Sequence, residues 1–130
     1  MSLSFHFHGH GTYTLTVDGT RLLIDPFFSN NPVADVTADN VEADYILVTH
    51  GHFDHVGALA DLEARTEAPV YAHADAVPML ERATAAASMW GFTIEQPLPP
   101  DHLLQEGEVV AVGELRPVVL SSPGHAPGHV

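Results

Sequence analysis

Four side chains that can bind a metal ion lie within six consecutive positions near the middle of the chain. They are His50, His52, Asp54 and His55, in the pattern His-x-His-x-Asp-His. Residues i and i+2 of an extended segment point the same way, so His50 and His52 can reach one ion. Asp54 and His55 are neighbours that must diverge, so they suit a second position beside the first. The sequence therefore predicts a metal site at this motif.

The ligand types limit which metal this motif would hold. Neutral imidazole and carboxylate suit zinc, iron or manganese, and the chain has no cysteine to supply a thiolate. The alternative interpretation is a loop of solvated histidines. It is disfavoured because the motif follows an apolar run typical of a buried strand. At such a place three histidines and an aspartate would repel and desolvate one another without a cation.

A second histidine cluster closes the chain in residues 122–129, Ser-Pro-Gly-His-Ala-Pro-Gly-His. Its Pro-Gly turn aims His125 away from a strand end, so His125 can complete a three-histidine site with His50 and His52. Such a set leaves one coordination position open for water. Taken alone, this segment fits a surface turn equally well, but the first motif favours the metal site. His129 is expected to hydrogen-bond near the ligands rather than to bind the ion.

Composition narrows the class of protein further. The chain has 130 residues, four arginines, no lysine, ten histidines and a net charge of -13. That charge disfavours binding to nucleic acid or to anionic membranes, because no basic cluster faces the phosphates. The N-terminus is mixed polar and the longest apolar runs reach about five residues, so neither a signal peptide nor a membrane span is expected. A cytoplasmic protein with a small-molecule substrate is predicted.

The predicted elements place the first motif between a strand and a helix. Residues 12–17 alternate polar and apolar side chains, which indicates a half-buried strand, and residues 45–49 form a continuous apolar run, which indicates a strand buried on both faces. Residues 91–105 are rich in proline and are expected to be irregular. Strands alternating with helices after a β-meander predict an α/β layered domain. Strands are expected at residues 3–8, 12–17, 21–25, 45–49, 69–72, 107–113 and 117–120, and helices at 56–66 and 75–88.

The two histidine motifs carry a resemblance to a known family. Residues 49–57 and 122–129 resemble the signatures of the metallo-β-lactamase superfamily in content, order and separation. The N-terminal part is similar to ascorbate-phosphate-lactonase-like metal-dependent hydrolases, and the later part is more similar to glyoxalase-II-type hydrolases. Residues 8–11, 23–27 and 43–47 carry the first likeness; residues 89–92, 100–107 and the closing Pro-Gly-His turn carry the second.

The resemblance implies a four-layer αββα sandwich with a two-metal site at the edge of its sheets. By this likeness His50, His52 and His125 hold the first ion, and Asp54 and His55 contribute to the second. Zinc is the first expectation for both ions, with iron or manganese as alternatives. A metal-bound hydroxide would attack an ester, thioester or lactone, and thioester cleavage of the glyoxalase-II kind is favoured.

Two further residues, Asp25 and His10, take supporting roles under the same resemblance. Asp25, at an Asp-Pro strand end, is expected to hydrogen-bond to the ligands, and His10 is the best candidate for the wall of the site. Asp54 is expected to be catalytic as well as a ligand, because it would orient the hydroxide and carry its proton. His129 is again placed beside the ligands.

The sequence departs from the family where the chain ends. Family members carry a metal-bridging aspartate and a last histidine downstream of the Pro-Gly-His turn, and this chain stops at Val130. Residues 1–130 are therefore expected to form the N-terminal half of the fold, a mixed sheet with flanking helices. Such a half would expose an apolar face, so self-association is expected. The alternatives to a thioesterase are a catalytically incomplete metal-binding module, a fragment without function, and a phosphodiesterase or lactonase of the same superfamily.

Overall fold

The sheet begins as a meander of three antiparallel strands. In the computed structural model, which describes residues 1–130, β1 (Leu3–Gly9), β2 (Thr12–Val17) and β3 (Thr20–Ile24) pair in succession. Asp18 and Gly19 turn the chain between β2 and β3 with φ of 47° and 87°, a conformation that these residue types tolerate best. The three predicted strands are confirmed to within one residue at each end.

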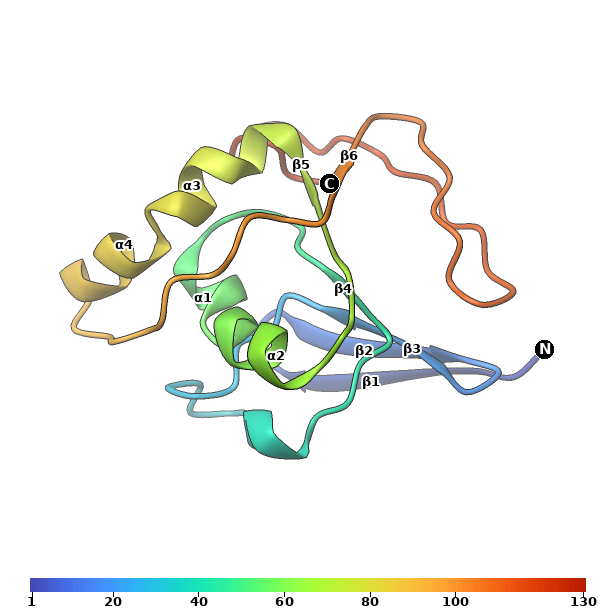
Figure 1. Ribbon diagram of the computed structural model, residues 1–130, viewed down its shortest axis with the longest axis horizontal. Helices are drawn as coiled ribbons and strands as arrows, with labels where there is room; N and C mark the ends of the chain where they lie inside the picture. Colours follow the sequence, from blue (N-terminus) through green and yellow to red (C-terminus); the bar gives the residue numbers. More distant parts are fainter.

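Three parallel strands extend this meander. β4 (Tyr45–Leu47), β5 (Val70–His73) and β6 (His102–Leu104) follow β3 in the order β1-β2-β3-β4-β5-β6 (Figure 1). Because parallel strands share one direction, the carboxyl ends of β3, β4 and β5 lie at the same edge of the sheet. The histidine motif of residues 50–55 follows β4 at that edge.

Short helices cover one face of the sheet. They are α1 (Phe53–Val56), α2 (Leu59–Arg65), α3 (Val77–Glu81) and α4 (Ala83–Met89), with 3-10 turns η1 (Ala38–Asn40) and η2 (Ala74–Ala76). Figure 1 shows the four α-helices on one side of β4 and β5. Ile46 and Val48 are fully buried against Leu59 and Leu62, which anchors the strand before the motif. The mixed sheet with flanking helices confirms the α/β class. No helix is long and apolar enough to cross a membrane.

Both predicted helices are interrupted. The first begins early, at Phe53, and breaks between Val56 and Leu59. Tertiary contacts explain this break, because Ala58 N donates to Pro26 O at 2.9 Å and Gly57 packs closely against the ring of Phe27. The second is divided into η2, α3 and α4, with a break at Arg82 that no contact explains.

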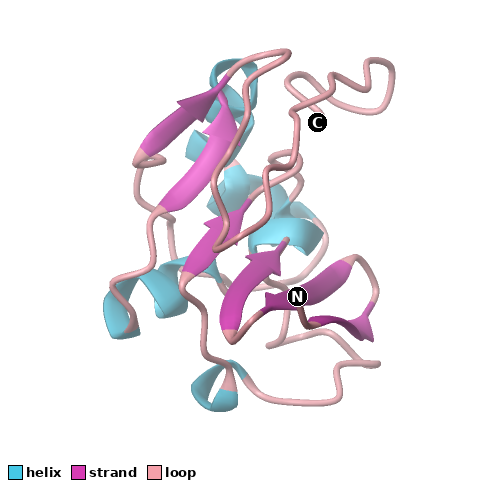
Figure 2. Cartoon of the chain, turned by 90° about the vertical axis from the view of Figure 1, so that its right-hand side faces the viewer, coloured by secondary structure: helices cyan, strands magenta, loops and turns pink.

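The segment after α4 differs most from the prediction. β6 lies in the stretch expected to be irregular, because Asp101 joins it to β5: Asp101 N donates to Val70 O at 2.9 Å, and Val70 N donates to Asp101 Oδ2 at 2.8 Å. The strands predicted at 107–113 and 117–120 form only isolated bridges, Val109–Val118 and Val112–Leu115. Figure 2 draws the chain after β6 as loop. The two segments are nevertheless joined by backbone hydrogen bonds, such as Val110 N to Pro117 O and Val119 N to Glu108 O, and only Val112 and Val119 among their apolar residues are buried.

The sheet face opposite the core helices is apolar and partly open. Leu15 pairs with Leu22 and with Phe5, so all three lie on this face, where Phe5 and Phe7 are 62% and 53% exposed. The self-association predicted above stays a prediction, and this face is the surface that would mediate it. We expect the sedimentation coefficient to rise with concentration, and less so after Phe5→Ser and Phe7→Ser. A monomer at every concentration would contradict it.

Candidate metal centre

Three histidines from separate segments converge beside the carboxyl end of β4. His50 follows that strand, His52 precedes α1, and His125 comes from the closing turn. One ring nitrogen of each lies within 4.8 Å of the others, and His50 Nε2 is 3.2 Å from His125 Nε2. A tetrahedral zinc with Zn–N bonds of 2.0–2.1 Å would hold its nitrogens about 3.3 Å apart. The spacing of this pair therefore fits two ligands of one ion.

The surroundings keep the imidazoles of His50 and His52 neutral. Burial, followed by the neighbouring His55, His52 and His125, lowers the pKa of His50 to about 3. Burial and the nearby His125 also lower the pKa of His52. A neutral imidazole offers a lone pair to a metal, whereas a protonated one cannot. His50 and His52 are therefore in the protonation state that metal binding needs.

Asp25 orients ligands of both predicted positions. It is buried, with φ of 50°, directly after β3. Its carboxylate accepts hydrogen bonds from Thr49 N at 2.7 Å, Thr49 Oγ1 at 2.5 Å and His55 Nδ1 at 2.9 Å. Because Thr49 Oγ1 donates to Asp25, it accepts from His50 Nδ1 at 2.8 Å, which leaves the lone pair of His50 on Nε2. Asp25 thus sets the tautomers of His50 and His55.

A second group of possible ligands lies beside the first. One ligand atom each of His10, Asp54 and His55 lies within 4.8 Å of the other two, and His10 Nε2 donates to Asp54 Oδ2 at 2.8 Å. Burial alone would raise the pKa of Asp54, but the hydrogen bond from His10 and the charge of His55 outweigh it, so this pKa is lowered. Burial works against the charged form of His55, yet Asp25 and Asp54 leave its pKa raised. His10 therefore contacts Asp54 directly, and its role as a wall residue stays a prediction.

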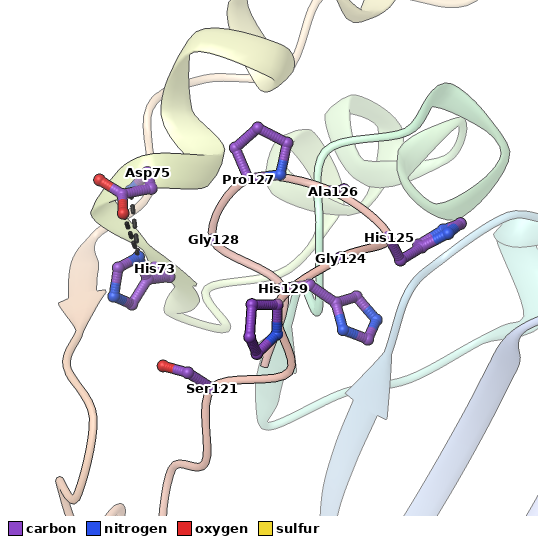
Figure 3. A pocket seen from close by; sticks show the side chains of 10 residues that line it. His73, Asp75, Ser121, Gly124, His125, Ala126, Pro127, Gly128 and His129 are labelled. Atoms are coloured by element: carbon purple, nitrogen blue, oxygen red, sulfur yellow. Dashed lines mark hydrogen bonds and ion pairs between the residues drawn. The ribbon is translucent and has the colours of Figure 1, made fainter.

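His129 lies beside the ligands without joining them. Its Nδ1 donates to Ser122 O at 3.2 Å, and its ring centre is 4.9 Å from that of His50. The closing turn borders a cavity of about 440 Å³. Figure 3 shows His125 and His129 projecting to the same side of this turn, away from His73 and Asp75. His73 has a local role, because its Nδ1 accepts from Asp75 N at 3.1 Å.

Space for a substrate adjoins the histidine motif. A hollow of about 540 Å³ is bordered by His52 and Asp54 on one side and by Arg82 and Trp90 on the other. Trp90 is 75% exposed, and Arg82 forms no ion pair within 4.0 Å. The hollow therefore combines an apolar surface with an unpaired positive charge.

Gly51 allows the motif to pack against α3. A Cβ built at Gly51 would lie 2.6 Å from Met79 Cβ and 3.0 Å from Leu80 N. Gly51→Ala is therefore expected to shift His50 and His52, destabilise the protein by about 1–3 kcal/mol and weaken zinc binding. Thermal unfolding and zinc titration measure both effects. Gly91→Ala is the control: a Cβ there meets nothing within 4 Å but alanine is strained at its φ of 81°, so it should lower stability while leaving zinc binding unchanged.

Two threonines hydrogen-bond to residues of the site, and the sequence did not predict a role for either. Thr49 connects Asp25 to His50, as described above. Thr12 is fully buried, and its Oγ1 donates to Asp25 O at 2.7 Å and accepts from Phe27 N at 3.2 Å, which fastens the turn that carries Asp25. The only signal for Thr12 is a polar residue at the start of a half-buried strand. Thr49 adjoins the motif, which is a stronger signal.

The fold and this cluster of ligands define a class of protein. The sequence profile described as the metallo-beta-lactamase superfamily matches residues 8–130. The chain belongs to that superfamily.

The chain is similar to individual proteins that are named metal-dependent hydrolases. A UPF0173 metal-dependent hydrolase of Staphylococcus aureus (strain MRSA252) is 39% identical over 94 residues, which is 72% of this chain and 40% of that protein. The same hydrolase in strain JH9 is 38% identical over 94 residues. The chain therefore spans less than half the length of these curated relatives.

Solved structures show the same fold. TTHA1623, whose structure was determined in a di-iron-bound form, has a TM-score of 0.72 and 35% identity over 91% of this chain and 58% of that one. BLEG-1, a B3 metallo-beta-lactamase, has a TM-score of 0.74 and 27% identity over 97% of this chain and 65% of that one. These likenesses support the metallo-β-lactamase-type fold expected from the two histidine motifs.

Proposed function

We propose that this chain carries the metal centre of a hydrolase that cleaves an ester, thioester or lactone. The observation that carries the proposal is the convergence of His50, His52 and His125, with His50 Nε2 and His125 Nε2 only 3.2 Å apart. The proposal is also supported by the membership of this chain in the metallo-β-lactamase superfamily and by its likeness to relatives named metal-dependent hydrolases.

The residues of the site would have different roles according to their positions. His50, His52 and His125 would hold one ion, and Asp54 and His55, with His10 beside them, would hold a second. Divalent ions supply the Lewis acid that activates water and polarises a carbonyl oxygen. Asp54, held as carboxylate by its lowered pKa, would orient the attacking water and accept its proton. Asp25 and Thr49 would keep His50 turned toward the ion.

Zinc remains our first proposal for both ions, because three neutral imidazoles with an open position are typical of catalytic zinc sites. Iron is the alternative, which the di-iron-bound form of TTHA1623 supports. Thioester cleavage of the glyoxalase-II kind is the first proposed subtype, followed by lactone and phosphodiester hydrolysis. The substrate would lie in the hollow beside His52 and Asp54. We place the activity in the cytoplasm.

Turnover of a substrate panel tests this function. The protein, stripped with a chelator and reloaded with Zn²⁺ or Fe²⁺, is assayed on ester, thioester, lactone and phosphodiester substrates. We expect turnover of at least one class by the metal-loaded protein, none by the stripped protein, and a loss of at least about 100-fold in kcat for Asp54→Asn. If the metal-loaded protein turns over no class, the proposal is wrong.

A binding module without turnover is the second candidate. One difference between the two proposed metal positions favours it. Three histidines supply the first position, whereas the second has only Asp54 and His55, and His10 beside them is hydrogen-bonded to Asp54. Metal analysis by plasma emission separates the two. One ion per chain at these residues together with no turnover supports the module, and two ions with turnover support the hydrolase.

A further inference from the structure

A separate cluster of metal-binding side chains lies on β1 and the loop that follows β3. The ligand atoms of His6, His8 and Asp35 all lie within 4.8 Å of one another. His6 Nε2 is 2.5 Å from Asp35 Oδ2, and His8 Nδ1 is 2.9 Å from Asp35 Oδ1. Each oxygen of one carboxylate therefore faces one imidazole nitrogen. None of these three residues belongs to the centre at His50.

The backbone holds these three side chains together. His6 and His8 are two positions apart on one strand, so they share a face, and their rings stack with centres 4.4 Å apart. Asp35 N donates to His8 O at 3.3 Å, and Asn31 Nδ2 donates to Gly9 O at 3.4 Å, so the loop is fastened to β1 at two points. The cluster is thus assembled by β1 and a loop pinned to it.

His8 is oriented as a metal-bound histidine is. Its side chain is only 9% exposed, and its Nε2 lies 2.7 Å from Thr14 Oγ1. With an ion in place of the proton between His8 Nδ1 and Asp35, Nε2–H would donate to that hydroxyl and the lone pair on Nδ1 would face the ion. A hydrogen bond from the outer ring nitrogen is the usual device that orients a histidine ligand.

We propose that His6, His8 and Asp35 bind a divalent transition-metal ion, Zn²⁺ in the first instance, at a site apart from the hydrolase centre. Two imidazoles and one carboxylate are a ligand set that zinc accepts, with the remaining position filled by water. The ion would replace the protons that the rings share with Asp35, so it would join β1 firmly to the loop. The acidic chain, with a net charge of -13, raises the local concentration of cations.

The neighbouring charges leave the cluster free to take an ion. Arg21 is engaged with Glu42 and Asp44, and Arg65 donates to Ala38 O and lies near Asp39. Neither arginine contacts Asp35, whose charge is shared only between His6 and His8. Ordinary histidine–aspartate pairing is the competing interpretation, and it predicts no bound metal.

Zinc content per chain decides between the two interpretations. Asp35→Asn removes the carboxylate charge at the cluster, and Asp39→Asn is its matched control, because the Asp39 side chain is 88% exposed and lies 3.9 Å from Arg65 Nε. After zinc loading and gel filtration, we expect Asp35→Asn to retain one zinc fewer per chain than the wild type and Asp39→Asn. Equal zinc contents in the two variants would overturn the proposal.

A signal from the histidines themselves distinguishes loss of the metal site from loss of the fold. His6 is 59% exposed, so His6→Gln should fold normally. In the wild type, Zn²⁺ should shift the ¹⁵N resonances of His6 and His8 in nuclear magnetic resonance spectra, and the titration midpoint should rise at least about 10-fold in His6→Gln. His50→Ala should leave these shifts intact, which separates this site from the hydrolase centre. If the ¹⁵N resonances of His6 and His8 did not shift on addition of Zn²⁺, the proposal would also be overturned.

Discussion

His50→Ala is expected to remove tight metal binding from the three-histidine site. His50 contributes the most buried of the three rings, and its Nε2 is the atom closest to His125. Changes to residues that merely orient a ligand weaken metal affinity by about 10–100-fold, so removing the ligand itself should cost at least about 100-fold. Hydrolysis by the metal-loaded protein should fall below detection.

Thermal unfolding with and without Zn²⁺ separates the loss of metal binding in His50→Ala from the loss of stability that removing a buried ring causes. A ligand at 100 times its Kd stabilises the folded state by about 2.7 kcal/mol, so zinc should raise the Tm of the wild type by several degrees. In His50→Ala at the same zinc concentration, most of that rise should vanish, even if the metal-free variant melts lower. The control is His102→Ala, since His102 is exposed and bonded to Glu108. An undiminished rise in His50→Ala would contradict the assignment.

Most of the proposed metal ligands could be singled out from the sequence because their spacing is local. His50 and His52 need only an extended backbone to share a direction, and Asp54 and His55 follow in the next turn. His125 lies 75 residues from His50, so its place beside the motif rested on its Pro-Gly turn together with the family resemblance. The contact of His10 with Asp54, 44 residues apart in the sequence, was not predicted.

Features that depend on contacts between distant segments were the ones that sequence reasoning missed. Thr12 bonds the backbone of Asp25, 13 residues away, and nothing in the sequence near Thr12 signals this role. β6 exists because Asp101 bonds Val70 across 31 residues, which overrides the irregular character of a proline-rich stretch. The segments predicted as strands at 107–113 and 117–120 do bond to each other, but only through isolated bridges rather than as strands of the sheet.

Asp25→Ala is expected to destabilise the protein by about 3 kcal/mol or more and to weaken both metal positions at once. The substitution leaves Thr49 N–H and Thr49 Oγ1 without their acceptor in a buried place, and it frees His55 Nδ1. Without Asp25 to accept from Thr49, the hydroxyl can donate to His50 Nδ1 instead, so the proton of His50 moves to Nε2 and blocks the metal. Urea unfolding and zinc titration measure the two losses.

Backbone strain must be separated from the lost hydrogen bonds, because alanine is unfavourable at the φ of 50° found at Asp25. Asp18→Ala is the matched control: Asp18 has φ of 47° in an exposed turn, so it carries the strain without the buried bonds. Asp25→Asn adds a second comparison, since asparagine tolerates this φ and can still accept from Thr49 N–H. Its amide cannot accept from both Thr49 Oγ1 and His55, so its metal affinity should fall about 10–100-fold with a smaller loss of stability. If Asp25→Ala lost no more stability than Asp18→Ala, the hydrogen bonds of Asp25 would not be what holds this edge of the sheet together.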